Sequence, residues 1–196
     1  MKKYEFLPPP EVLHYQATPK QASLLTVAVI AALAAVSGNA FATTTINTDT
    51  TYSSGYDDSV SITSSGQLHG ADQTDMSIAG TLSNSGKVSQ GQSLSVGGKI
   101  TNNTGAIIEN IGTISGGEGL SNKGTIKGDR LITSGYTENL GGTIEIGQFG
   151  DADHAVEFYV GGGTIDVSND SYVKSMRIGN VVDTETSVTF QRNLNV

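Results

Sequence analysis

Residues 120–128 read LSNKGTIKG, and this stretch decides the fold. Leu120 and Ile126 flank Asn122 and Gly124 at a spacing that suits neither a helix nor one straight strand. A unit that recurs along a chain is typical of a stacked, repetitive structure. The pattern recurs as LSNSGKV at 82–88, as IENIGTI at 108–114 and, with one residue inserted, as ITNNTGAI at 100–107.

Glycines carry the same pattern through most of the chain at a regular period. Six of them stand two positions before Ile, Leu or Val and are 20, 19, 19, 18 and 21 residues apart: Gly66, Gly86, Gly105, Gly124, Gly142 and Gly163. The runs between them, such as GTIEIG and HAVEFYV, are short and alternate apolar with polar residues, as strands do. Three short strands and their turns need about 18–21 residues, so the period predicts an all-β, single-stranded parallel β-helix.

The glycines and asparagines are predicted to be structural turn positions. A glycine adopts backbone angles that cost other residues free energy, which is the role expected of Gly124. An asparagine tolerates a left-handed backbone and, in a stack, can bond to its copy one coil away. Asn122 stands two residues before Gly124, and the repeats place Asn84, Asn103 and Asn110 in the same way before their glycines.

The first 42 residues resemble an export signal rather than part of the fold. Lys2, Lys3 and Lys20 give a positive flank, and thirteen uncharged residues at 24–36 are too few to span a bilayer. Ala40 and Ala42 fit a cleavage site, so residues 1–42 are predicted to be a signal peptide, with a retained interfacial anchor as the alternative. We then expect a capping coil at 43–65 and a β-helix domain at 66–196.

The remaining chain is acidic and lacks cysteine. Without residues 1–42, which hold three of the eleven basic and two of the nineteen acidic residues, its net charge is about −9. This charge disfavours nucleic acid and anionic lipid as partners, because both are bound by clustered Lys and Arg. Packing and backbone pairing must therefore stabilise the fold.

An export signal followed by a cysteine-free Leu-x-Asn-x-Gly-x-Ile repeat resembles the passenger region of a Gram-negative autotransporter adhesin. The resemblance covers about residues 43–190 and implies a right-handed parallel β-helix at the cell surface or released from it. The family ends in an outer-membrane translocator barrel, and nothing in the tail TETSVTFQRNLNV resembles its strands. The chain is therefore expected to be a truncated passenger, a passenger with a separate translocator, or a small secreted protein.

Parallel β-helices also include enzymes that degrade polysaccharides, and these use paired carboxylates. The candidate cluster here is Asp151, Asp153, His154 and Glu157, in GDADHAVEF. On a strand, Asp151 and Asp153 would share one face and could act as acid and base or hold a cation. The alternative is an insertion loop between coils, because the gap from Gly142 to Gly163 is the longest of the series.

The sequence therefore predicts a protein for display and contact rather than an enzyme, with no cofactor, metal or catalytic residue. Its expected partner is a host or bacterial surface glycan or protein, or a second copy of the chain. The expected place is the cell surface or the medium, in association with the outer membrane. A polysaccharide lyase or glycoside hydrolase is the alternative.

Overall fold

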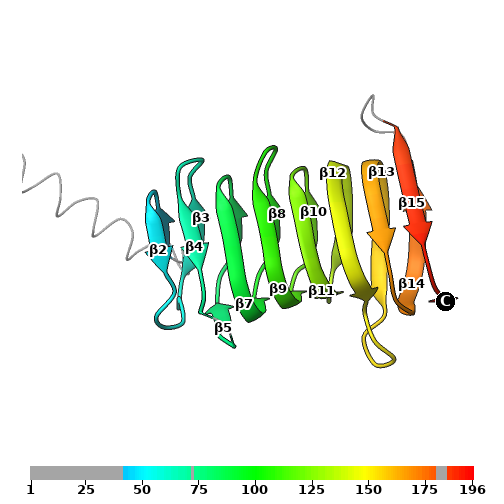
Figure 1. The fold of residues 1–196 in the computed structure, drawn as a ribbon, viewed down its shortest axis with the longest axis horizontal. Coiled ribbons are helices and arrows are strands. Elements are labelled where there is room, and N and C mark those ends of the chain that lie inside the picture. Colours follow the sequence, from blue (N-terminus) through cyan, green and yellow to red (C-terminus); the bar gives the residue numbers. More distant parts are fainter. Residues whose placement is uncertain (1–41, 72, 180–184) are drawn as a thin grey trace, which may run out of the picture. The chain divides into compact units, whose positions relative to one another are not determined.

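The structure, a computed structural model, describes residues 42–71, 73–179 and 185–196. These residues form an all-β parallel solenoid of about 8 turns, with no helix among them (Figure 1). The prediction of a parallel β-helix from the glycine period is confirmed. The predicted signal peptide lies outside the described residues, apart from Ala42.

Each coil has three sides, and every side pairs in parallel with the same side of the next coil. The first side holds β1 (Thr43–Ile46), β3 (Ser59–Ile62), β6 (Leu82–Asn84), β8 (Ile100–Asn102) and β10 (Leu120–Asn122). The second side begins with β2 (Asp49–Thr51) and β4 (Gln67–His69), and the third with β5 (Asp75–Ile78). Longer strands bend from the second side into the third: β7 (Lys87–Val96), β9 (Ile107–Gly116) and β11 (Thr125–Thr133).

The carboxyl-terminal coils continue this stack with fewer breaks between strands. Their strands are β12 (Tyr136–Phe149), β13 (Val156–Val167), β14 (Ser171–Ile178), β15 (Thr186–Phe190) and β16 (Leu194–Asn195). The first part of β12 pairs with β10 and β13, and its later part pairs with β11 and again with β13. This one strand thus runs through all three sides, which joins them into a single sheet.

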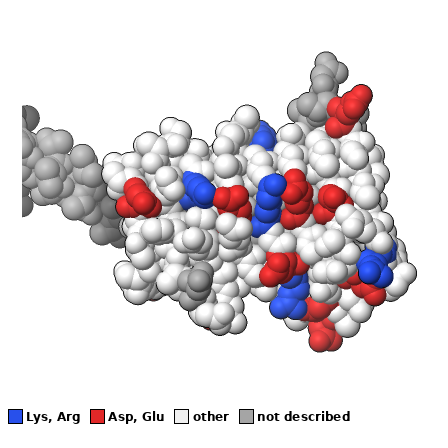
Figure 2. Space-filling model, in the orientation of Figure 1, with Lys and Arg blue, Asp and Glu red and all other residues white. Residues whose placement is uncertain are grey.

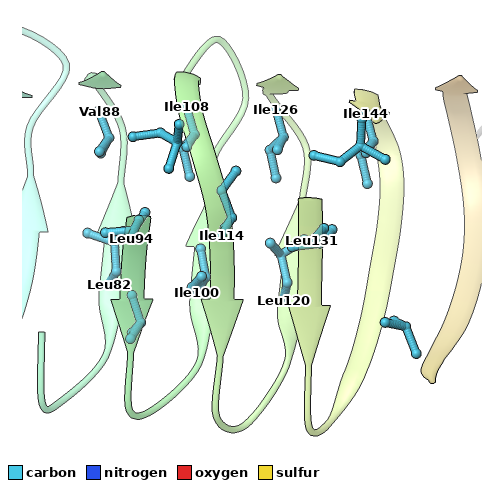
Figure 3. Packing of buried hydrophobic residues seen from close by; sticks show 14 of the residues in the cluster. Leu82, Val88, Leu94, Ile100, Ile108, Ile114, Leu120, Ile126, Leu131 and Ile144 are labelled. Atoms are coloured by element: carbon cyan, nitrogen blue, oxygen red, sulfur yellow. The ribbon is translucent and has the colours of Figure 1, made fainter. Parts of the chain in front are cut away.

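The core consists of columns of aliphatic side chains, one residue per coil (Figure 3). On the second side the column is Leu68, Val88, Ile108, Ile126, Ile144 and Ile165, all at most 1% exposed. Burying one such side chain contributes about 1.5–3 kcal/mol before conformational entropy is set against it. Alternation in each short strand, with the apolar residue inward, is why the sequence forms this core.

A column of four buried asparagines runs beneath the corner between the first and second sides. The Asn84 Nδ2 donates to Asn102 Oδ1 at 2.9 Å, Asn102 to Asn122 at 2.9 Å, and Asn122 to Asn139 at 2.8 Å. All four side chains are fully buried. Each amide also bonds to backbone groups of its corner, so the column ties successive turns together.

Two of the predicted asparagines, Asn103 and Asn110, lie at turns but outside this column. Asn102, rather than Asn103, pairs with Asn84 and Asn122, because the inserted residue of ITNNTGAI lies in the turn after it. Asn103 lies half-exposed beside Ser85, and Asn110 is exposed at another corner. Asn139, which the pattern missed, completes the column.

The glycines at this corner are required by close packing between coils more than by unusual backbone angles. A Cβ at Gly124 would lie 2.3 Å from the Ala106 carbonyl oxygen and 2.6 Å from that of Asn103, although its φ is not positive. The predicted reason for Gly124 is therefore wrong. Gly105 does have a φ of +79°, but open space surrounds it, and Ala106 takes the corner position in that coil.

Candidate functional site

The corner between the second and third sides carries a row of amide residues in a left-handed backbone conformation. Gln73, Gln90 and Asn110 have φ values of 68°, 58° and 55°. Gln90 and Asn110 hold equivalent places in adjacent coils, since the residues beside them pair Ser89 with Glu109 and Gly91 with Ile111. Such a backbone conformation in a residue other than glycine lowers stability by about 1–2 kcal/mol. Successive coils keep this conformation despite the cost.

The next coil lacks this left-handed residue. Strand β11 spans 9 residues where β9 spans 10, and the pairing of the two strands shifts between Ile126 and Gly128. Gly128 has no side chain, and its neighbour Asp129 is exposed. The shorter corner therefore leaves a recess beside the protruding amides.

The recess is a groove of about 850 Å³ that crosses successive coils. A second recess of about 390 Å³ shares Gly128, Asp129 and Glu145 with it, and extends it toward the carboxyl-terminal coils. The side chains that line the two are mainly amides and charged groups: Gln73, Gln90, Gln92, Asn110, Lys127, Asp129, Glu145, Asp166, Ser168, Asn169 and Gln191.

One wall of the groove adjoins a row of charged side chains on the second side. Figure 2 shows blue and red groups alternating along the stack, over β7, β9, β11 and β12. Lys87 lies 2.7 Å from Glu109, and Lys127 lies 2.8 Å from Glu145. The hydrogen bond to Glu145 raises the pKa of Lys127, with the nearby carboxylates adding to the effect. These pairs are exposed and contribute little to stability, but they fix the position of the Lys127 side chain at the groove.

Chemically, this lining suits a ligand with many hydroxyl groups. An amide both donates and accepts hydrogen bonds, and a carboxylate accepts two or more. Pockets for small apolar ligands are lined mainly by hydrophobic and aromatic side chains, whereas Ile111 and Ile146 are the two apolar side chains among the described residues that line these recesses. The groove is therefore built for polar contacts repeated from coil to coil.

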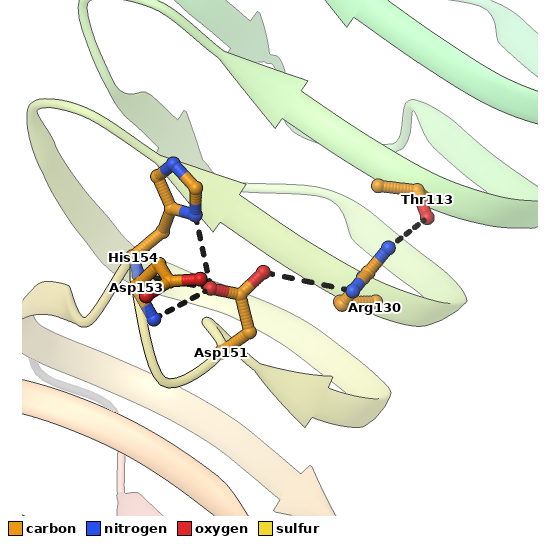
Figure 4. Close-up of polar contacts among 5 residues, drawn as sticks. All are labelled: Thr113, Arg130, Asp151, Asp153 and His154. Atoms are coloured by element: carbon orange, nitrogen blue, oxygen red, sulfur yellow. Dashed lines mark hydrogen bonds and ion pairs between the residues drawn. The ribbon is translucent and has the colours of Figure 1, made fainter.

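The predicted acidic cluster lies elsewhere, in the loop between β12 and β13 (Figure 4). Asp151 Oδ1 accepts hydrogen bonds from the backbone N–H groups of Asp153 and His154, at 3.0 and 2.9 Å, and lies 2.9 Å from His154 Nδ1. Its Oδ2 lies 3.6 Å from Arg130. The hydrogen bond with His154, helped by the two backbone donors, lowers the pKa of Asp151.

The structure thus places these residues in an insertion loop and not on a strand. Glu157 belongs to β13 and forms an ion pair of 2.7 Å with Lys174, whose hydrogen bond lowers the pKa of Glu157. The hydrogen bonds of Asp151 Oδ1 thus hold the conformation of its own loop. Within the described ranges, no group of three or more His, Cys, Asp or Glu is placed to hold a metal ion.

Of the site residues predicted from the sequence, only Asn110 lines the groove. The sequence reasoning missed the glutamines and Asp129, because it followed one column of glycines. Glycines also recur at the groove corner, in two positions of the coil: Gly91 and Gly128 are in register with Ile111, and Gly112 and Gly147 lie against Gln92 and Asp129 of the preceding coils.

Comparisons with protein-family models, with curated protein sequences and with solved structures gave no match. Residues 42–71, 73–179 and 185–196 also contain no helical segment with the length and hydropathy of a membrane span.

Proposed function

We propose that this protein is exported and makes adhesive contacts at a cell surface, with the amide-lined groove holding a stretch of surface glycan. The observation that carries the proposal is the groove itself, which repeats polar side chains across successive coils. Hydroxyl-rich polymers can be bound by such repeated hydrogen-bond donors and acceptors. Each hydrogen bond contributes little affinity, and several together contribute much more.

The spacing of the groove supports a polymer as ligand. Successive coils of a parallel sheet lie about 4.8 Å apart, which is close to the advance of one sugar residue in an extended polysaccharide. Gln90 and Asn110 are one coil apart, so each can meet its own sugar. A linear glycan lying along the solenoid would thus meet one polar corner per residue.

Rigidity also favours contact over catalysis. Backbone hydrogen bonds join successive coils, and the asparagine column also joins the four coils from Asn84 to Asn139, so the groove is formed before a ligand arrives. Preformed sites lose less conformational entropy on binding. The Asp151 carboxylate of the acidic loop is engaged in hydrogen bonds within the loop, and this supports binding without cleavage.

Export and surface display are proposed from the signal-like residues 1–42 and from the resemblance to autotransporter passengers. In this proposal a separate or missing translocator carries the solenoid through the outer membrane. Cells that express the locus are expected to adhere to a glycan-coated surface better than cells that lack it.

A glycan array with purified protein tests the proposal most simply. The variant Gln90→Gly/Asn110→Gly removes both amides while suiting the left-handed backbone, so it should fold normally and lose glycan binding. Gln67→Ala, at an exposed position of β4 outside the groove, is the control and should bind like the unchanged protein. Equal binding by both variants, or no binding by the unchanged protein, would contradict the proposal.

A further inference from the structure

The charges of the groove are unbalanced. Its lining contains one ammonium group, on Lys127, and three carboxylates, on Asp129, Glu145 and Asp166. Lys127 bonds to Glu145 at 2.8 Å, so these two charges offset each other. The carboxylates of Asp129 and Asp166 remain.

Among residues 42–71, 73–179 and 185–196, no Lys, Arg or His forms an ion pair with either of these two carboxylates. Asp166 accepts a hydrogen bond from the neutral amide of Gln191 at 2.9 Å. The Asp129 side chain is exposed, and no residue in the described ranges forms a hydrogen bond or ion pair with it. The middle of the groove therefore has a net negative charge that a ligand can offset.

The two carboxylates lie in different coils. The coil that holds Glu145 and Gly147 lies between them. Asp129 is in register with Gly147 on one face of this coil, and Asp166 is in register with Glu145 on the other. They are thus two coil spacings apart, about 9–10 Å along the axis. A polymer in the groove would meet them at two different sugar residues.

We propose that the glycan held in this groove carries amino groups, as in a polymer of partly or wholly deacetylated amino sugars. This inference rests on the proposed glycan-binding function and narrows it. The amides bind the hydroxyl groups, and Asp129 and Asp166 bind protonated amines through charge-assisted hydrogen bonds. The same charges repel uronic acid polymers and sulfated glycans, whose carboxylates and sulfates would face the two aspartates.

The experiment compares three oligosaccharides of equal length with the purified protein by calorimetry, at low salt and at a pH where the amines are protonated. They are a glucosamine oligomer, an N-acetylglucosamine oligomer and a galacturonic acid oligomer. We expect the glucosamine oligomer to bind tightest and the galacturonic acid oligomer not at all. Salt should weaken only the first, because it screens the charges.

Two variants separate the inference from the function on which it rests. Asp129→Asn/Asp166→Asn should weaken binding of the glucosamine oligomer about tenfold and leave the N-acetylated oligomer unchanged. Asp57→Asn/Glu118→Gln, which removes two carboxylates outside the groove, should change neither. Equal affinity for glucosamine and N-acetylglucosamine oligomers, lost in Gln90→Gly/Asn110→Gly, would overturn the amine preference and keep the glycan site. Binding of none of the three oligomers would overturn both.

Discussion

Coils between residues 82 and 146 and coils from residue 149 onward fill the same interior in different ways. The first group places an asparagine at one inward position of every coil and stacks aliphatic residues at the others. At that inward position the later coils have Val160, and they fill the interior with aromatic rings. The ring centroids of Phe149 and Phe158 are 4.2 Å apart, and those of Phe149 and Phe190 are 6.5 Å apart.

The difference shows how a buried column of polar side chains can end inside the solenoid. Backbone groups complete the hydrogen bonds of its first and last members. The first amide, on Asn84, accepts a hydrogen bond from the Gly86 N–H through its oxygen. The last, on Asn139, donates to the carbonyl oxygens of Gly142 and Gly162. Because both ends are satisfied by backbone, the column can stop and hydrophobic packing can continue after it. Among the described residues, no buried side-chain nitrogen or oxygen lacks a hydrogen-bond partner.

The largest effect is expected in the aromatic coils. Phe149→Ala should lower the free energy of unfolding by about 3–5 kcal/mol, because it removes a fully buried ring that contacts two others. Urea denaturation measures this. Ile108→Val, in the aliphatic column, should cost only about 1 kcal/mol. Similar losses for the two variants would mean that the aromatic cluster is not the tighter core.

Breaking the asparagine column should have the next largest effect. Asn102→Ala leaves Asn84 without its acceptor and Asn122 without its donor, at a cost of about 3 kcal/mol. Asn103→Ala, one position along, should cost about 0.5 kcal/mol, because that side chain is half-exposed. Thermal and urea unfolding of the two variants compare them directly. If Asn103→Ala were the more damaging, the register of this turn would be wrong.

Two glycines of the same period should respond differently to alanine. Gly124→Ala brings a methyl group onto two carbonyl oxygens of the coil below and should cost about 2–3 kcal/mol. Gly105→Ala meets open space and should cost about 1 kcal/mol, for its positive φ alone. Unfolding in urea distinguishes the two, and equal costs would count against close packing between coils as the reason for Gly124.

The smallest effect concerns the loop that precedes the aromatic coils. Since the pKa of Asp151 lies below its usual value, the loop is stabilised above the ordinary pKa of an aspartate and loses this as pH falls through the lowered pKa. The protection factors of the Asp153 and His154 amides, which are exchange rates corrected for the intrinsic dependence on pH, should therefore fall only at acid pH. Asp151→Asn should show low protection factors that do not change with pH. Protection factors in the unchanged protein that stayed constant down to acid pH would contradict the role of this carboxylate.

The sequence was sufficient to predict the solenoid, because a glycine period and alternating strands are local signals that survive in every coil. It could not place Asn102, since the inserted residue in ITNNTGAI can lie on either side of the asparagine and only stacking decides. The reason for Gly124 also required the structure. Its constraint comes from the coil below, at a distance of about one period in the chain.

The candidate site was less predictable than the fold. The acidic cluster stood out because its residues are close in sequence, but local hydrogen bonds tie Asp151 into its loop. The larger recess alone assembles residues from five coils, such as Gln73, Gln90 and Asp129, and they form no continuous motif in the sequence. Only the stacking of the coils brings them to one corner.

Nuclear magnetic resonance can locate a ligand at the corner between the second and third sides. A glucosamine oligomer is added to isotope-labelled protein, and the backbone amide shifts are followed. We expect shifts concentrated at residues 90–92, 110–112 and 127–129, with the first side unchanged. Shifts on the first side or at the ends of the solenoid, or none at all, would contradict the proposed binding surface.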